Sequence, residues 1–345
     1  MLRILDANAN RAGEGLRVVE EFARLGLDDS HLTGALKQLR HELQEALSGV
    51  ELSGRLAARD TQADVGATVS TPQEAARRDV ASVVAASFAR VEQSLRCLEE
   101  YGKLAAAGAP QGFPAAIEQL RYRLYTLQRA VQISVDSHRR LARTQLYALI
   151  DGGETCDALS ASAERLIAAG VDAIQLRDKR LDDRQLLHRA RRLRELIGQR
   201  DTLLIVNDRP DLAVLARADG VHVGQEELAV KDVRTIVGPE MLIGVSTHSI
   251  EQARAAVLDG ANYIGVGPTF ASQTKQFDAL PGVELVRTVS AEIALPAFAI
   301  GGIDVQNVEQ VVQAGARRIA VGAAVQQAAD VPAVVAALRR ALPAL

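Results

Sequence analysis

Eight short apolar runs, rich in β-branched residues, recur through the second half of the chain and alternate with stretches of helical periodicity. The runs lie near residues 146–150, 173–176, 203–206, 220–223, 242–245, 263–266, 297–300 and 318–321. Strands that alternate with helices at spacings of roughly 20–30 residues are typical of a parallel sheet. Eight such units within about 200 residues predict a (β/α)8 barrel, an α/β fold of the TIM-barrel type. A doubly wound open sheet is the alternative, but it usually has fewer repeats.

The first part of the chain follows a different pattern, because it carries helical periodicity alone. We therefore predict an all-α helical domain over residues 1–135, a linker over 136–143 and the barrel over 144–345. A capping box at residues 71–74, with Pro at the first helical position, predicts the start of a long helix that ends near residue 104.

The helical domain contains an internal repeat. Residues 10–26 read NRAGEGLRVVEEFARLG, and residues 89–105 read ARVEQSLRCLEEYGKLA. Two arginines and two glutamates are identical in the copies: Arg11, Arg17, Glu20 and Glu21 in the first, and Arg90, Arg96, Glu99 and Glu100 in the second. The four arginines either form an anion site or pair with the glutamates at i,i+3 and i,i+4.

Composition limits the class of protein. The chain has 345 residues, of which 48% are hydrophobic, and a net charge of −3, which argues against a general nucleic-acid binder. No apolar run approaches the ~18 residues of a membrane span, so we expect no membrane partner. The N-terminus lacks a signal-peptide pattern and the two cysteines form no metal motif, so we expect a cytoplasmic protein.

Polar residues follow the predicted strands where a barrel of this kind places its active site. Gln175, Arg177 and Lys179 alternate at the end of the second strand, and alternate residues of an extended segment point to the same side. Three such heads suit an anionic substrate, although an exposed loop is the simpler alternative.

Two carboxylates at the following strand ends, Asp208 and Glu227, suit a hard cation such as Mg²⁺, and a buried ion pair is the alternative. Gly302 and Gly322 are predicted to open helices after strands seven and eight, where such barrels bind phosphate, and two tight turns are the alternative. His222 is interpreted as a core residue or a general base, and His248 as a hydrogen-bond donor. These features indicate an enzyme with a diphosphate–Mg²⁺ subsite and a monophosphate subsite.

The motifs QLRDK (175–179), VND (206–208), GVHVGQE (220–226), GVS (244–246), GP (267–268) with TK (274–275), and GGI (301–303) resemble thiamine-phosphate synthases. The resemblance implies that hydroxymethylpyrimidine diphosphate is joined to thiazole phosphate, and that diphosphate leaves before the thiazole nitrogen attacks. These small phosphorylated molecules are the expected partners. Glu227 and Ala323 depart from the usual Asp and Ser, and Ser272 stands where Thr is common.

The same resemblance implies roles for individual residues. The pyrimidine diphosphate would be bound by Gln175, Arg177, Lys179, Asn207, Ser246 and Lys275. The thiazole phosphate would be bound by Ser272, Thr274, Gly302, Gly322 and Ala323, and Mg²⁺ by Asp208 and Glu227.

The N-terminal run DANANR (6–11), followed by GEGLR (13–17), resembles a helical family associated with a dedicated hydroxymethylpyrimidine-phosphate kinase. The resemblance implies ATP as a second cofactor. The candidate site residues are Asn8, Asn10, Arg11, Glu14, Arg17, Arg59 and Asp60.

Three other functions are compatible with the sequence. A thiazole tautomerase would share the phosphate end of the barrel but would not need the Gln-Arg-Lys and Asn-Asp residues. A non-catalytic helical domain would serve dimerisation or regulation, and in the first case the protein would be a homo-oligomer. A sensor of thiamine phosphate would bind ligand without turnover.

Overall fold

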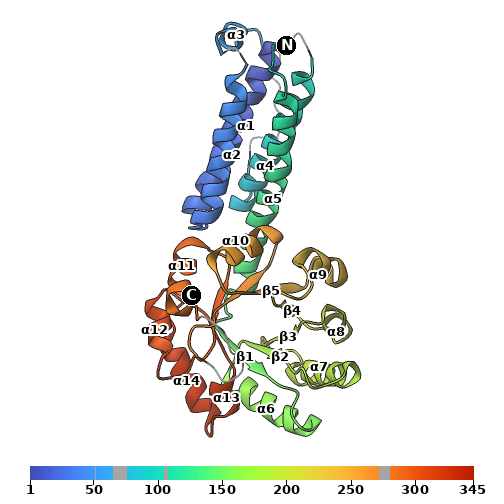
Figure 1. Ribbon diagram of the computed structural model, residues 1–345, viewed down its shortest axis with the longest axis vertical. Coiled ribbons are helices and arrows are strands. Elements are labelled where there is room, and N and C mark those ends of the chain that lie inside the picture. Colours follow the sequence, from blue (N-terminus) through green and yellow to red (C-terminus); the bar gives the residue numbers. More distant parts are fainter. Residues whose placement is uncertain (51, 65–75, 105–107, 272–279) are drawn as a thin grey trace. The chain divides into compact units, whose positions relative to one another are not determined.

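A computed structural model describes residues 1–50, 52–64, 76–104, 108–271 and 280–345. The chain divides into two compact units, Met1–Val131 and Gln132–Leu345. The first is helical and the second is a barrel of strands and helices (Figure 1). The fold class predicted from the sequence, an all-α region followed by a (β/α)8 barrel, is confirmed.

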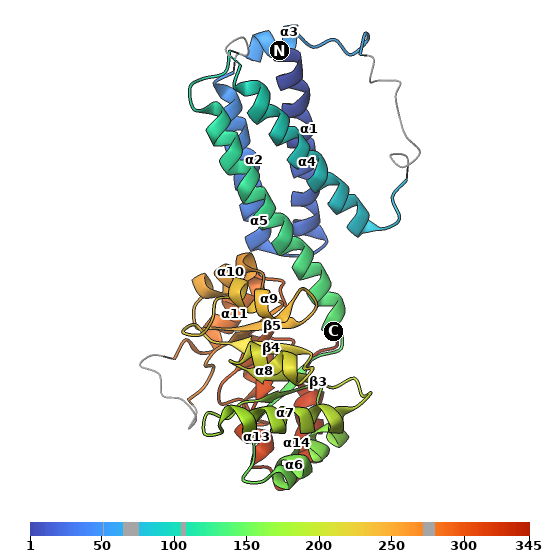
Figure 2. The same ribbon diagram turned by 90° about the vertical axis from the view of Figure 1, so that its right-hand side faces the viewer.

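The helical unit is formed by α1 (Leu2–Leu25), α2 (Ser30–Ser48), the short α3 (Leu52–Ala57), α4 (Val80–Gly102) and the first part of α5 (Phe113–Arg140). Helix α1 packs against both α2 and α4 (Figure 2). Their buried faces carry leucine and valine, such as Leu16 and Leu39, at the helical spacing seen in the sequence.

The start of α4 differs from the prediction. Its N-cap is Asp79, whose carboxylate accepts a hydrogen bond from Ser82 N at 2.7 Å, while Ser82 Oγ accepts one from Asp79 N at 3.2 Å. This local capping box fixes the first turn at Val80. The helix therefore begins later than the capping box at 71–74 predicts, and residues 71–74 lie outside the described residues.

The internal repeat is visible as two equivalent ion-pair clusters. Glu20 on α1 accepts hydrogen bonds from Arg17 at 3.1 Å and from Arg40 on α2 at 2.7 Å. Glu99 on α4 accepts them in the same way, from Arg96 at 2.7 Å and from Arg121 on α5 at 2.9 Å. Both glutamates are buried. Each helix pair is thus joined by a buried carboxylate between two guanidinium groups.

The predicted linker is largely helical. Helix α5 continues to Arg140, so that residues 136–140 complete its last turns rather than forming a flexible connection. These turns belong to the barrel unit and pack within it, because Asn262 Nδ2 donates to Ser137 Oγ at 3.2 Å and Arg140 donates to Glu240 O at 2.6 Å. The packing explains why a polar, Arg-rich segment that resembles a linker stays helical.

Eight parallel strands close into a barrel in sequence order. They are β1 (Leu146–Ile150), β2 (Ala173–Leu176), β3 (Leu203–Asn207), β4 (Gly220–Val223), β5 (Leu242–Thr247), β6 (Tyr263–Val266), β7 (Ala297–Ile300) and β8 (Ile319–Val321). The last pairing, between β1 and β8, places Leu146 opposite Ile319. All eight predicted strands are present, with ends that differ by at most two residues.

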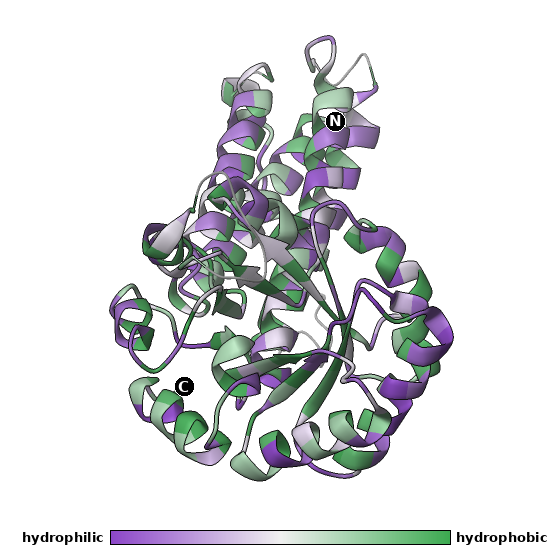
Figure 3. Cartoon of the chain, turned by 60° about the horizontal axis from the view of Figure 1, so that its bottom comes forward, coloured by the Kyte–Doolittle hydropathy of each residue, from purple (hydrophilic) through white to green (hydrophobic). Residues whose placement is uncertain are grey.

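Helices surround the strands. They are α6 (Cys156–Ala169), α7 (Asp183–Ile197), α8 (Pro210–Leu215), α9 (Val230–Val237), α10 (Ile250–Asp259), α11 (Gly282–Glu292), α12 (Val308–Gln313), α13 (Ala323–Gln326) and α14 (Val331–Ala341). The strands are mainly hydrophobic, and the helices around them alternate hydrophobic with hydrophilic residues (Figure 3). This pattern is expected because the strands are covered on both faces.

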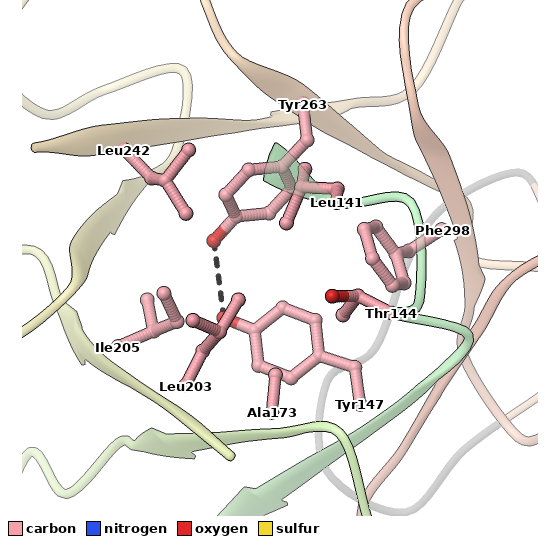
Figure 4. A pocket seen from close by; sticks show the side chains of 9 residues that line it. All are labelled: Leu141, Thr144, Tyr147, Ala173, Leu203, Ile205, Leu242, Tyr263 and Phe298. Atoms are coloured by element: carbon pink, nitrogen blue, oxygen red, sulfur yellow. Dashed lines mark hydrogen bonds between the residues drawn. The ribbon is translucent and has the colours of Figure 1, made fainter. Parts of the chain in front are cut away.

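Aromatic and aliphatic side chains fill the barrel at the N-terminal ends of its strands (Figure 4). Tyr147 and Tyr263 each meet Phe298 edge to face, with ring centroids 5.4 and 5.5 Å apart. Leu141, which follows α5, closes this end. The polar residues that are predicted to form the site lie at the opposite, C-terminal ends of the strands.

Candidate active site at the strand ends

Charged side chains from three consecutive loops meet at the C-terminal end of the barrel. Lys179 follows β2, Asp208 follows β3 and Glu227 follows β4. The Lys179 Nζ atom lies 3.7 Å from Asp208 Oδ2 and 3.9 Å from Glu227 Oε1. The structure thus brings both predicted metal ligands to one predicted diphosphate-binding residue.

Asp208 occupies a constrained position. Its backbone has a φ of 61°, in the left-handed region, and its N–H donates to His222 O at 2.8 Å. Burial and the neighbouring charge of Glu227 raise the pKa of Asp208, while the positive charges of Lys179 and Arg177 oppose that shift. Burial and a like charge thus outweigh the two positive charges at Asp208.

Gly224 makes room for the second carboxylate. A Cβ atom added at Gly224 would lie 2.4 Å from Glu227 Oε2. The neighbouring Gln225 anchors the same loop, because its Nε2 donates to Ser246 O on β5 at 2.6 Å. The GQE motif thus has a geometric role, since it lets the loop after β4 turn back with Glu227 close to the barrel.

Arg177 provides a positive charge near the same carboxylate. Its backbone N–H donates to Ile150 O at 2.8 Å, which fixes the end of β2 against β1. Its guanidinium charge acts on the pKa of both Asp208 and His222. Within the described part of the chain no carboxylate forms an ion pair with Arg177, so its charge is available to an anionic ligand.

Asp178 is a structural residue that the sequence analysis did not single out. Its buried carboxylate accepts hydrogen bonds from Gly152 N at 3.0 Å and from Arg180 N at 2.8 Å, and it also binds the Arg180 guanidinium at 2.7 Å. The Arg180 contact and these N–H groups hold the pKa of Asp178 well below its usual range. Asp178 therefore ties the loop that carries Arg177 and Lys179 to the loop after β1.

Gln175 and Ser246 are positioned from inside the barrel. The Gln175 side chain is buried, and its Nε2 donates to Tyr147 Oη at 2.7 Å. Ser246 Oγ lies 2.9 Å from His222 Nε2. Asn207 is the last residue of β3, opposite His222, and its amide lowers the pKa of the adjacent Asp208.

The two histidines have different environments. His222 is buried on β4, and burial lowers its pKa to about 4, so the ring is neutral at neutral pH. It is hydrogen-bonded within the core, as the core interpretation predicts. His248 Nδ1 lies 2.6 Å from Gly267 O, and because a carbonyl can only accept, the histidine is the donor, as expected from the sequence.

The glycine positions after β7 and β8 differ from each other. Gly322 is the N-cap of the short helix α13, which begins at Ala323, as predicted. Gly302 does not open a helix, because α12 begins only at Val308. Gly302 instead has a φ of +63°, and an added Cβ would lie 2.7 Å from Ala271 O, so the backbone turns tightly against the loop after β6.

Three further residues of the barrel were predicted to bind the substrates. Ser272, Thr274 and Lys275 lie outside the described residues. Their assignment to the two substrates stays a prediction from the resemblance.

In the helical unit, a polar cluster forms around Asp6, a buried residue that was not among the candidates. Arg59 binds the Asp6 carboxylate through two hydrogen bonds of 2.7 and 3.0 Å, and Asn10 Nδ2 lies 3.4 Å from Asp6 Oδ2. Arg3 donates to Asp60 O at 2.8 Å. Asn10 on α1 is thus near Arg59 and Asp60, which follow α3.

Other candidates of the helical unit lie apart from that cluster in their contacts. Asn8 is buried and donates to Ile4 O at 2.9 Å within α1. Arg11 and Glu14 are exposed. Arg17 binds Glu20 at 3.1 Å and Glu21 at 2.6 Å, as the ion-pair interpretation predicts.

No group of three or more His, Cys, Asp or Glu side chains in the described part of the chain is arranged to hold a metal ion. Among the helices that the structure describes, none is long and apolar enough to cross a membrane.

Comparison with known families gives two matches. A family model described as thiamine monophosphate synthase matches residues 146–325, which span the barrel strands. A second model, described as the ThiD2 family, matches residues 3–130, within the helical unit.

Curated relatives extend over both units. A thiamine-phosphate synthase of Rhodopirellula baltica is 51% identical over 93% of this chain and 87% of its own length. One from Gloeobacter violaceus is 44% identical over 96% of this chain and 93% of its own length. Among solved structures, a thiamine phosphate pyrophosphorylase from Pyrococcus furiosus is 32% identical and has a TM-score of 0.52 over 57% of this chain and 94% of its own.

Proposed function

The chain belongs to the thiamine-phosphate synthase family, whose members are transferases, and from this premise we propose how its barrel carries out the reaction. Hydroxymethylpyrimidine diphosphate and thiazole phosphate bind at the C-terminal strand ends. The bond between the pyrimidine methylene carbon and diphosphate breaks, and the electron pair leaves with diphosphate. The thiazole nitrogen then donates its lone pair to that carbon, which forms thiamine phosphate.

One observation carries this proposal, which is the meeting of Lys179 with Asp208 and Glu227 at distances of 3.7 and 3.9 Å. A departing diphosphate needs positive charge where its own negative charge develops. Lys179 and the nearby Arg177 supply two fixed positive charges. Arginine and lysine are the usual partners of phosphate oxygens, and charge-assisted hydrogen bonds of this kind are strong.

The two carboxylates fit the requirements of Mg²⁺. This ion prefers oxygen ligands and is usually held by one or two carboxylates together with substrate phosphates and water. Asp208 and Glu227 supply that number of carboxylates, and the raised pKa of Asp208 is consistent with a position that needs a cation. Mg²⁺ held there would neutralise part of the charge on the diphosphate group.

The remaining barrel residues complete two subsites. In this proposal Gln175, Asn207 and Ser246 hold the pyrimidine, with Lys275 on its diphosphate. The backbone N–H groups near Gly302, Gly322 and Ala323 bind the phosphate of the thiazole substrate, and Ser272 and Thr274 contact its ring. Gly302 and Gly322 suit this role because they lack a Cβ atom that would keep phosphate from the backbone.

Arg177→Ala tests the diphosphate subsite and separates a synthase from a tautomerase. We expect KM for the pyrimidine diphosphate to rise at least about tenfold, while KM for thiazole phosphate changes less than about twofold. Arg184→Ala, an exposed arginine on α7, is the matched control. Unchanged kinetics in Arg177→Ala, or a defect confined to thiazole phosphate, would contradict the assignment.

We further propose that the helical domain, residues 1–135, phosphorylates hydroxymethylpyrimidine phosphate with ATP and so supplies the diphosphate that the barrel consumes. The match of residues 3–130 to the ThiD2 family supports this proposal. The cluster of Asp6, Asn10, Arg59 and Asp60 is the favoured site. The buried Asp6 carboxylate holds Arg59 in place, while the Arg59 side chain is partly exposed. The Arg59 guanidinium can therefore also bind a phosphate group that arrives from solvent.

The test uses the full-length protein with hydroxymethylpyrimidine monophosphate, ATP, Mg²⁺ and thiazole phosphate. We expect thiamine phosphate to form only when ATP is present. Arg59→Ala should abolish this reaction but leave product formation from the pre-formed diphosphate intact, whereas Arg24→Ala, a more exposed arginine of α1, should behave as wild type. If the wild-type protein forms product from the pre-formed diphosphate but none from the monophosphate with ATP, the helical domain is non-catalytic.

A further inference from the structure

A chain of hydrogen bonds crosses the interior of the barrel below the proposed site. Gln175 Nε2 lies 2.7 Å from Tyr147 Oη. Tyr147 Oη in turn lies 3.1 Å from Tyr263 Oη, a contact drawn as a dashed line in Figure 4. Tyr263 Oη lies 3.3 Å from His222 Nδ1, and His222 Nε2 lies 2.9 Å from Ser246 Oγ. The chain therefore begins and ends at residues that the proposed function places on the pyrimidine substrate.

We infer that Tyr147, Tyr263 and His222 are positioning residues, which fix the hydrogen-bonding polarity that Gln175 and Ser246 present to the pyrimidine substrate. This inference rests on the proposed function, because it concerns the same subsite. It goes beyond that function by stating which atom each of the two residues offers.

The direction of the chain follows from the chemistry of its members. The Nε2 group of Gln175 can only donate, so Tyr147 Oη accepts from it. Each tyrosine has a single hydroxyl proton, and both hydroxyls are buried, where an unused proton is costly. Tyr147 therefore donates to Tyr263, and Tyr263 donates to Nδ1 of His222. A neutral histidine with an accepting Nδ1 carries its proton on Nε2 and donates it to Ser246 Oγ.

The surroundings of His222 support a neutral ring. The ring is buried, and burial disfavours the charged form of an imidazole. The ring therefore has one proton at neutral pH, and the tautomer is set by its two partners. A charged ring, by contrast, would donate from both nitrogens and would reverse the bond to Tyr263.

The backbone is also adapted to this chain. A Cβ atom added at Gly244 would lie 2.1 Å from Tyr263 Cζ and 2.5 Å from His222 Nδ1. One added at Gly265 would lie 3.4 Å from His222 Cε1. Strands β5 and β6 thus carry glycine where the tyrosine and histidine meet. This arrangement indicates that the interior is packed around the hydrogen-bonded pair.

The result is a defined pattern for the substrate. Gln175 uses its amide nitrogen inside the barrel, so it offers its carbonyl oxygen, an acceptor, to the pyrimidine. Ser246 accepts from His222, so it offers its hydroxyl proton, as a donor. The acceptor suits the amino group of the pyrimidine, whose charge becomes more positive as diphosphate leaves. The donor suits a ring nitrogen or a phosphate oxygen.

Nitrogen-15 NMR of histidine-labelled, substrate-free protein tests the direction without any assay of activity. His222→Gln identifies the His222 signals by their loss. We expect a neutral ring at pH 7 with the proton on Nε2. In Tyr263→Phe the Nδ1 resonance should shift toward that of a nitrogen with no donor, whereas Tyr122→Phe, at an exposed tyrosine, should leave it unchanged. A proton on Nδ1, or a charged ring, would overturn the inference.

Tyr147→Phe provides the second measurement, because it releases the Gln175 amide and leaves the Tyr263–His222 contact in place. We expect KM for the pyrimidine diphosphate to rise roughly fivefold to tenfold, with KM for thiazole phosphate nearly unchanged. Gln175→Ala should raise the same KM. If Gln175→Ala has no effect while the His222 tautomer is as predicted, the substrate-binding role of Gln175 is wrong, but the direction of the hydrogen bonds is confirmed. If Gln175→Ala raises KM but Tyr147→Phe does not, the positioning role fails.

Discussion

Lys179 and Asp208 follow neighbouring strands, and their Nζ and Oδ2 atoms lie 3.7 Å apart. Glu227 Oε1 lies 3.9 Å from the same ammonium group. This distance is longer than that of a close ion pair, and the lysine is largely exposed. The contact therefore adds little stability by itself. Its significance is that one positive and two negative groups meet where the proposed diphosphate and Mg²⁺ would bind.

Asp208→Asn should reduce Mg²⁺-dependent turnover by about 100-fold, because a neutral amide neither attracts a cation nor offers two anionic oxygens. Folding should be little affected, since burial and Glu227 already disfavour the Asp208 carboxylate. Steady-state rates across a Mg²⁺ titration and thermal unfolding measure the two effects. Asp201→Asn, at an exposed position, is the control. A wild-type rate in Asp208→Asn would refute its metal role.

The pH dependence of activity should depend on the Mg²⁺ concentration. The pKa of Asp208 is raised, so its reactive charged form is lost at a higher pH than for an ordinary carboxyl group. Bound Mg²⁺ favours the charged form and lowers that pKa. Activity profiles should therefore lose their acid limb at progressively lower pH as Mg²⁺ increases. An acid limb that does not move with Mg²⁺ would argue against a metal on Asp208.

Gly224→Ala should weaken the response to Mg²⁺, because the added methyl group would displace the Glu227 carboxylate from its position 2.4 Å away. The displaced atom is the end of a flexible side chain, so the fold should persist. The Mg²⁺ concentration for half-maximal activity should rise roughly tenfold. Gly34→Ala, where nothing lies within 4 Å, is the matched control. An unchanged Mg²⁺ requirement would show that Glu227 acts elsewhere.

Asp178→Ala should affect both stability and substrate binding. The substitution leaves the N–H groups of Gly152 and Arg180 without their acceptor, which costs about 1–3 kcal/mol. The loop that carries Arg177 and Lys179 should then be less ordered, so KM for the pyrimidine diphosphate should rise. Thermal unfolding and steady-state kinetics on one preparation check both effects. A lower melting temperature with unchanged KM would restrict Asp178 to a structural role.

In the helical unit, Arg121→Ala should destabilise more than Arg96→Ala, although both arginines bind Glu99. The Arg121 side chain is nearly buried, whereas the Arg96 side chain is more than half exposed. Loss of the buried partner should cost about 2–3 kcal/mol, and loss of the exposed one less than about 1 kcal/mol. Thermal unfolding of the full chain, with the transition of the helical unit resolved, measures the difference. Equal effects would contradict this distinction.

The barrel, and the end of it where the candidate residues lie, could be predicted because each strand and its end can be read locally from the sequence. Each strand is a short apolar run, and the fold places every residue after a strand at the same end of the barrel. Asp208 and Glu227 therefore came together as expected. The start of α4 was less predictable, because the sequence carries a second capping box, Asp79 with Ser82, a few residues after the one at 71–74.

The interior hydrogen bonds could not be predicted in this way. Tyr147, Tyr263 and His222 lie at the starts or middles of strands, where the pattern indicates core packing alone. Their polar atoms meet only because β1, β4 and β6 face one another across the barrel. The structural role of Asp178 could not be predicted for a related reason, since its partner Gly152 belongs to a different loop. In the sequence, a glycine inside a strand, Gly244, indicated a crowded interior.

The most direct measurement gives purified full-length protein pre-formed hydroxymethylpyrimidine diphosphate and thiazole phosphate, with and without Mg²⁺. Thiamine phosphate and free diphosphate are quantified together. The account predicts equal amounts of the two products, formed at an appreciable rate only when Mg²⁺ is present. Absence of thiamine phosphate under both conditions, or formation of thiamine phosphate at the same rate without Mg²⁺, would contradict it.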